Sequence, residues 1–150
     1  MATVSVHVDA TKEQVLALLK RAEVYPRWVI GTRRVVAVDP DWPAPGSSFT
    51  HEFGAGPLVG RDRTRVMSLD EEVGEITLDA RARPAGRARV HLHVTPCRDG
   101  TLVTLDEQPA AGPLALVPGV LMEPLTWVRN RRSLARLQRM AERDDGTPER

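Results

Sequence analysis

The sequence has almost no cysteine and almost no net charge, and both shortages narrow the classes of protein it can encode. Cys97 is the only cysteine among 150 residues, so the chain cannot form an internal disulfide and suits a reducing compartment. The formal net charge is +1, because 21 basic residues nearly balance 20 acidic ones. No overall electrostatic field therefore draws the chain towards nucleic acid or a charged membrane.

Long hydrophobic runs are also missing. The first eight residues contain neither the basic segment nor the apolar segment of a secretory signal. The only candidate for a membrane span, Gly112 to Val128, is interrupted by prolines, a glycine and Glu123. It is too short and too broken to cross about 30 Å of hydrocarbon. We therefore expect a cytoplasmic protein that does not insert into a membrane.

The chain does contain a series of short alternating segments that ends in an amphipathic helix. Residues 3–8 alternate apolar and polar side chains, as a half-buried strand does. Thr11 and Gln14 have capping-box spacing and begin a predicted helix that ends near residue 23, before a short helical turn at 24–31. Six further strands follow, each ended by a turn signal, and then a long helix that ends at residue 143. These strands are predicted at 32–39, 47–53, 58–69, 74–82, 86–95 and 101–107.

This order predicts an α+β fold, with an antiparallel sheet packed on a helix, as a single domain over residues 1–143. Residues 144–150 are predicted to form a flexible polar tail. The alternation of apolar and polar residues on both sides of the turn at 83–86 predicts that one face of the hairpin, the dry face, is buried. The opposite face is rich in arginine and histidine and is predicted to be exposed to water. The predicted pairs on the dry face are Ile76 with Val94, Leu78 with Leu92, Ala80 with Val90, and Ala82 with Ala88.

The same alternation places polar side chains on the dry face. His51 falls opposite Asp62 on the neighbouring strand, at a Cβ separation of about 5 Å. Thr64 and Glu107 face the same way. Burying an unpaired charge costs on the order of several kcal/mol. Either these groups pair with one another and with residues 129–131 of the final helix, or a wet cavity separates the sheet from that helix.

Four segments together resemble a known superfamily. They are "VSVHVDATKEQVLALLKRAEVYPRWVIG", "PAPGSSFTHEFG", "GRARVHLHVTPCRDGTLVTLDEQPAAGP" and "RNRRSLARLQRMAER", and they cover nearly the whole chain. Their order and spacing resemble the START-like (SRPBCC) superfamily, and within it the bacterial polyketide cyclase/dehydrase-like branch. This resemblance implies the helix-grip fold, in which a seven-stranded curved antiparallel sheet wraps around a long C-terminal helix, with two short helices after the first strand.

The resemblance also implies a deep, mostly apolar cavity between sheet and helix for a lipid, polyketide, sterol, quinone or similar molecule. The final helix would turn Leu125, Val128, Leu134, Leu137 and Ala141 towards the sheet. The residues expected to line the ligand site are Phe49, Phe53, Thr64, Leu78, Val90, Leu105, Glu107, Leu121, Leu125, Trp127 and Asn130.

Three functions remain open at this point. The first is binding of a hydrophobic or aromatic small molecule without chemistry. The second is a polyketide cyclase, aromatase or dehydratase in which His51 is the acid/base and Asp62 orients it, since histidine titrates near neutral pH. The third is a protein-interaction module. No segment is a catalytic signature, so the sequence leaves open whether the protein is an enzyme.

The remaining candidate sites have weaker support in the sequence. His91 and His93 form an H-x-H pair on the wet face, but no further ligand is placed to complete a zinc site, so we expect no metal and no cofactor. Cys97 lies in a turn without a base beside it, which indicates an inert thiol. The arginines of the final helix are interpreted as a solvated face rather than a nucleic-acid site, because aromatic residues do not alternate with them.

Overall fold

In the part of the chain that the structure describes, seven antiparallel strands form one sheet in the order β1-β7-β6-β5-β4-β3-β2. The computed structural model describes residues 2–55, 57–83, 86–116 and 118–143, so the tail predicted at 144–150 lies outside the described residues. The strands are β1 (Ala2–Val8), β2 (Thr32–Val38), β3 (Ser48–Ala55), β4 (Leu58–Asp70), β5 (Glu75–Ala82), β6 (Gly86–Cys97) and β7 (Gly100–Ala111).

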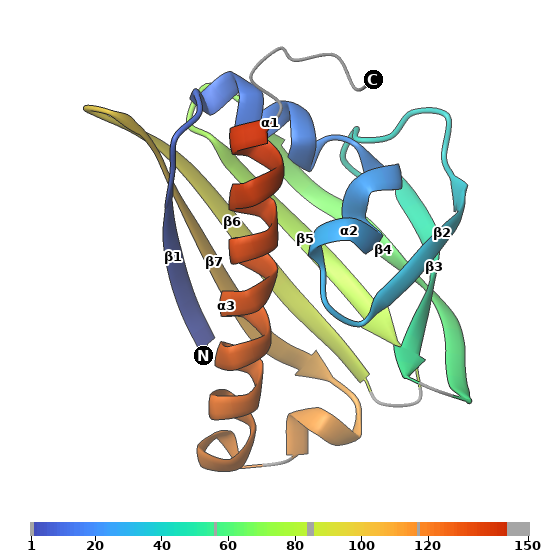
Figure 1. The fold of residues 1–150 in the computed structure, drawn as a ribbon. Coiled ribbons are helices and arrows are strands. Elements are labelled where there is room, and N and C mark those ends of the chain that lie inside the picture. Colours follow the sequence, from blue (N-terminus) through green and yellow to red (C-terminus); the bar gives the residue numbers. More distant parts are fainter. Residues whose placement is uncertain (1, 56, 84–85, 117, 144–150) are drawn as a thin grey trace.

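The helices stand before and after the six-strand meander. They are α1 (Lys12–Leu19), η1 (Ala22–Val24), α2 (Tyr25–Trp28), η2 (Pro113–Leu116) and α3 (Gly119–Arg143). Thr11 caps α1 through the predicted capping box, because its side chain accepts from the Gln14 amide and Gln14 accepts from the Thr11 amide. Figure 1 shows the sheet curving around α3, with α1 at one end of the concave face and α2 beside the middle of α3. The predicted helix-grip fold is confirmed.

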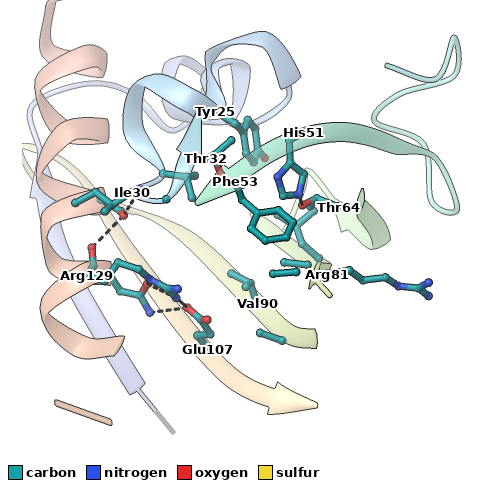
Figure 2. Close-up of a pocket in the computed structure, with 18 of the residues that line it drawn as sticks. Tyr25, Ile30, Thr32, His51, Phe53, Thr64, Arg81, Val90, Glu107 and Arg129 are labelled. Carbon is teal, nitrogen blue, oxygen red and sulfur yellow. Dashed lines mark hydrogen bonds and ion pairs between the residues drawn. The ribbon is translucent and has the colours of Figure 1, made fainter. Parts of the chain in front are cut away.

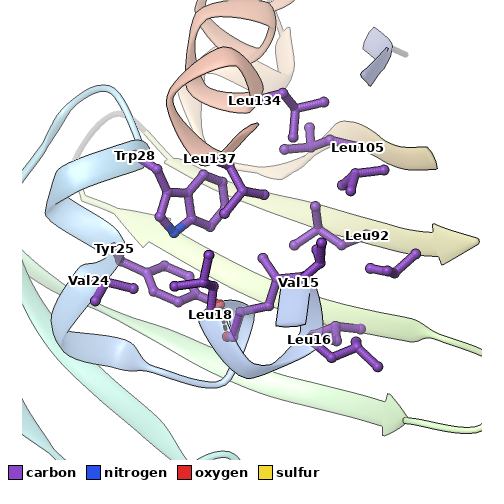
Figure 3. Close-up of a cluster of buried hydrophobic side chains, with 14 of the residues drawn as sticks. Val15, Leu16, Leu18, Val24, Tyr25, Trp28, Leu92, Leu105, Leu134 and Leu137 are labelled. Carbon is purple, nitrogen blue, oxygen red and sulfur yellow. Dashed lines mark hydrogen bonds between the residues drawn. The ribbon is translucent and has the colours of Figure 1, made fainter. Parts of the chain in front are cut away.

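The core lies between the concave face of the sheet, α1, α2 and the second half of α3. Figure 3 shows Leu134 and Leu137 of α3 over Leu92 and Leu105 of the sheet, beside Trp28 of α2. All five side chains are buried. The apolar stripe of α3 that begins at Leu134 is therefore what joins the helix to the sheet.

The strand register agrees with the sequence analysis at one hairpin and departs from it at another. His51 pairs with Asp62, as predicted. Ile76, however, pairs with Leu92 and not with Val94, so the β5–β6 register is shifted by two residues. Gly86 pairs with Ala82 at the start of β6, which agrees with the strand predicted at 86–95 and removes Gly86 from the turn predicted at 83–86. A shift of two leaves each side chain on its predicted face, since side-chain direction alternates with period two.

The first half of α3 does not face the sheet as expected. Leu125 and Val128 are exposed, whereas Leu134, Leu137 and Ala141 are buried as predicted. The reason is helical geometry, because Leu125 and Val128 lie on the side of the helix opposite the buried stripe at 3.6 residues per turn. Figure 1 shows the first turns of α3 extending past the N-terminal end of β1.

The division of α3 into a packed half and an exposed half predicts unequal effects of matched substitutions. Leu134→Ala should lower the free energy of unfolding by about 2–5 kcal/mol, because it opens a cavity in a filled core. Leu125→Ala should change it by no more than about 0.5 kcal/mol. Urea denaturation followed by circular dichroism measures both, and similar losses for the two variants would contradict this packing.

Candidate functional site

A cavity of about 330 Å³ lies between the concave face of the sheet, α2 and the middle of α3. Its floor includes three alanines, Ala80, Ala82 and Ala88, from the ends of β5 and β6 that meet at their hairpin. Its polar lining residues include His51 and Thr64 on one side and Glu107, Arg129, Asn130 and Ser133 on the other. The remaining lining side chains are mostly apolar or aromatic, among them Tyr25, Trp28, Val29, Ile30, Phe49, Phe53, Leu78, Val90, Leu92 and Leu105.

The cavity reaches solvent beside the middle of α3. Four of its lining residues are exposed: Gly31, Gly54, Pro109 and Arg129. They belong to the loop before β2, the end of β3, the end of β7 and α3. We call the opening between these four residues the mouth.

Aromatic rings form one wall of the cavity. The ring centroids of Tyr25 and Phe49 are 4.9 Å apart, and those of Phe49 and His51 are 5.5 Å apart. Phe53 continues the row at 6.0 Å from His51. Gly60 makes room for it, since a Cβ there would lie 2.7 Å from the tip of the Phe53 ring. Such a wall offers flat apolar surface to a ligand.

His51 is held as a neutral imidazole. Burial lowers its pKa, and the negative charge of Asp62 offsets only part of that effect. Its Nε2 lies 3.1 Å from the Thr64 hydroxyl. Its Nδ1 is buried and has no hydrogen-bond partner among the described residues. Desolvation therefore has a larger effect on the pKa of His51 than the neighbouring carboxylate.

Asp62 serves a different partner from the one predicted. Its carboxylate accepts hydrogen bonds from the backbone amides of Arg63 and Arg83, at 2.9 and 3.0 Å, and from Arg83 Nε at 3.0 Å. Burial alone would raise the pKa of Asp62, but the hydrogen bonds from Arg83 and Arg63 outweigh it and hold the pKa below its usual value. Within the described part of the chain, the carboxylate makes no hydrogen bond to His51, although the two residues are paired across the strands.

A second polar group stands at the mouth. Glu107 accepts hydrogen bonds from Arg129 and, at 2.9 Å, from Asn130 Nδ2 (Figure 2). Ser133 donates to the Arg129 carbonyl and accepts from the Ile30 amide at 3.1 Å, which ties α3 to the loop after α2. The half-buried Glu107 carboxylate is thus paired with α3, which is the first of the two alternatives that the sequence left open, and the cavity of the second alternative is present as well.

The structure brings most of the predicted ligand-site residues to the cavity. Those that line it are His51, Phe49, Phe53, Thr64, Leu78, Val90, Leu105, Glu107 and Asn130. Leu121, Leu125 and Trp127 do not line it, because they are exposed on the first half of α3. Asp62 is buried outside the lining.

The wall supplied by α2 was not foreseen. Tyr25 and Ile30 come from the segment "VYPRWVIG", for which the sequence predicted only a short helical turn. Trp28 is buried and also lines the cavity. The two aromatic residues of this short segment, Tyr25 and Trp28, could have signalled a wall, but alternation rules do not reach irregular segments.

The described residues contain neither a cluster of metal ligands nor a membrane-spanning helix. No group of three or more His, Cys, Asp and Glu side chains there could hold a metal ion. His91 instead contacts the Thr77 hydroxyl at 3.0 Å, and His93 lies 3.3 Å from Glu75. None of the described helices is both long and apolar enough to cross a bilayer.

Comparisons with solved structures agree with the fold. The chain is similar to the di-domain ARO/CYC StfQ from the steffimycin biosynthetic pathway, with a TM-score of 0.72 at 16% identity over 97% of this chain and 51% of that chain. A START superfamily protein from Mycobacterium smegmatis matches with a TM-score of 0.70 at 18% identity, over 95% of this chain and 97% of that one. A Nitrosomonas europaea protein matches with a TM-score of 0.73 at 12% identity, over 97% and 96%.

The chain spans about half the length of the di-domain proteins StfQ and BexL, of which it covers 51% and 45%. At these identities the likeness shows the helix-grip fold. A search of curated proteins found no match. The family described as polyketide cyclase/dehydrase and lipid transport has a model that matches residues 1–142, and the chain belongs to this family.

Proposed function

We propose that the protein binds a hydrophobic or aromatic small molecule in the cavity between the sheet and α3. The observation that carries the proposal is the cavity itself, whose volume of about 330 Å³ falls in the range of small-molecule sites. Its lining is mostly apolar and includes a row of aromatic rings. Membership of a family described by cyclase and lipid-transport activities supports the same function.

The polar groups of the cavity would orient the ligand. His51 and Thr64 lie on one side, and Glu107 with Arg129 lies on the other (Figure 2). A ligand with a hydroxyl or carbonyl group beside the imidazole would satisfy Nδ1, which has no partner among the described residues. A pure hydrocarbon would leave this nitrogen unpaired, so we propose a ligand with at least one polar group.

Filling the cavity should remove binding without unfolding the protein. Ala80→Leu adds bulk to the cavity floor, and we expect it to weaken binding of anilinonaphthalene sulfonate roughly tenfold or more. Ala17→Leu makes the same change on the exposed face of α1, outside the cavity lining, and should leave binding unchanged. Fluorescence titration measures both. Equal affinities in the two variants would place the probe site elsewhere and contradict the proposal.

The buried neutral His51 predicts a pH dependence of stability. Its pKa in the folded protein is below the value of about 6.5 expected in the unfolded chain. The unfolded state therefore binds this proton more readily, and stability present above that pH is lost as the pH falls through it towards the folded pKa. His51→Gln should flatten this loss, measured as unfolding free energy against pH.

His93→Gln is the matched control for that experiment, because His93 is an exposed histidine on the outer face of the sheet. It should retain the slope of the unmodified protein. A slope unchanged by His51→Gln would mean that the imidazole is not buried in the neutral form.

A second candidate function is cyclisation or dehydration of a polyketide-like substrate, favoured by a neutral imidazole that lines the cavity. In it His51 moves the proton, and Asp62 acts through its charge, which favours the protonated ring. With a poly-β-ketone thioester as substrate, His51→Ala should lower turnover by about 10²–10⁴-fold while probe binding persists. Turnover that persists in His51→Ala, or an absence of turnover in the unmodified protein, would leave binding as the function.

A further inference from the structure

The first half of α3 and the preceding η2 expose an unusual number of large apolar side chains. Leu116 is 86% exposed, Leu121 63% and Leu125 69%, and Trp127 and Val128 are exposed as well. We call these five residues the apolar end. A large exposed apolar set of this kind marks an interaction surface more often than a scattered surface leucine does.

These side chains are not a misplaced part of the core. Leu121, Leu125 and Val128 are spaced by four and three residues, so they form one stripe along α3. At 3.6 residues per turn that stripe lies opposite Asn130, Leu134 and Leu137, which are buried. The helix therefore has one apolar stripe for its own sheet and a second one, in its first half, that faces away from it.

Arginines continue the outward stripe. Arg132, Arg136 and Arg139 follow Val128 on the same side of α3 and are exposed. None of them has an ion pair or side-chain hydrogen bond within the described ranges 2–55, 57–83, 86–116 and 118–143. Arg131 lies 5.1 Å from the centroid of the Trp127 ring, at the border between the two parts. The face is thus apolar at its beginning and basic along its continuation.

We propose that this face docks on the surface of a bilayer that contains anionic phospholipid. The apolar end would enter the boundary between acyl chains and headgroups, and the arginines would pair with headgroup phosphates. This is adsorption at the interface and differs from the membrane insertion that the sequence analysis excludes, since no described helix can span a bilayer.

A lipid surface fits the order of these residues better than a second copy of the chain does. A bilayer changes from apolar to anionic over a few ångströms, and the stripe changes from leucine to arginine in the same sense. Two copies packed along the whole length of this face would set arginines against arginines in a parallel pair, or against leucines in an antiparallel pair. Neither arrangement is complementary.

The mouth of the cavity lies beside the proposed docking face. Leu125 is followed directly by Thr126, which lines the cavity, and Arg129 lies at the mouth one turn later. Docking would bring the mouth to the lipid surface, so that a hydrophobic ligand could pass between bilayer and cavity without crossing water. That consequence rests on the proposed function, but the docking does not require a filled cavity.

Vesicle flotation tests the proposal with the full chain and two kinds of vesicle, phosphatidylcholine alone and phosphatidylcholine mixed with phosphatidylglycerol. We expect flotation with the mixed vesicles and little with phosphatidylcholine. The double variant Leu121→Gln/Leu125→Gln should lose roughly tenfold or more in binding. Arg132→Gln/Arg139→Gln should lose about fivefold for each arginine.

Matched controls lie at the other end of the molecule. Val73 and Arg98 belong to the β4–β5 and β6–β7 turns, which Figure 1 shows at the end of the sheet far from η2. Both residues are exposed, and Val73→Gln and Arg98→Gln should float like the unmodified protein. Unfolding curves of all variants should coincide, because the substituted side chains lie outside the core.

Three outcomes would overturn the proposal. One is no flotation with either vesicle. Another is equal flotation with both vesicles and no effect of the arginine variants. The third is a dimer of the unmodified protein that Leu121→Gln/Leu125→Gln dissociates, which would assign the face to a second copy. In each case probe binding by Ala80→Leu would still test the proposed function separately, because that substitution changes the cavity alone.

Discussion

The inward side chains of β5 and β6 become smaller along the hairpin, and the cavity depends on this taper. Leu78 and Leu92 are buried in the core and border the cavity, whereas the smaller Ala80, Ala82 and Ala88 form its floor. Above the small side chains the helix cannot move closer to the sheet, because the large side chains elsewhere along the interface fix the distance between helix and sheet. The space above the alanines therefore stays open. One end of the interface is therefore filled and the other is hollow, with no break in either element.

Period-two alternation predicted which side chains face inward, whereas the cavity was implied only by the family resemblance. The limits of alternation are visible in particular residues. The faces of His51, Thr64 and Glu107 were predicted correctly because alternation along each strand decides them, and the two-residue register error between β5 and β6 changes no face. The hydrogen-bond partner of Asp62 was not predicted correctly. Asp62 pairs with Arg83 instead of His51, and Arg83 lies in a turn, where alternation does not predict the direction of a side chain. The outward leucines of α3 were missed for a related reason: an apolar helical segment predicts burial but does not say on which side.

Buried carboxylates explain part of the arginine-rich composition. Asp62 is paired with Arg83, Glu107 with Arg129, and Asp79 with Arg81 and Arg87. Each carboxylate is largely removed from water while its arginines remain partly in it, which limits the desolvation cost of the pair. The arginines of α3 beyond Arg131 have no such partner in the described part of the chain. Composition alone cannot separate the arginines that pair with carboxylates from those that do not, because both contribute equally to the net charge of +1.

The two halves of α3 have different structural roles, and this matters for access to the cavity. Among the described side chains of residues 121 and 123–129, Thr126 is half-buried and the others are exposed, so this half adds no fully buried apolar surface to the core. What holds the helix at the mouth is the pairing of Arg129 and Asn130 with Glu107 and the bond from the Ile30 amide to Ser133. A few polar contacts are individually weak when water can replace them. Opening the mouth therefore costs those contacts and leaves the Leu134–Leu137 packing intact, so a ligand can enter without partial unfolding of the domain.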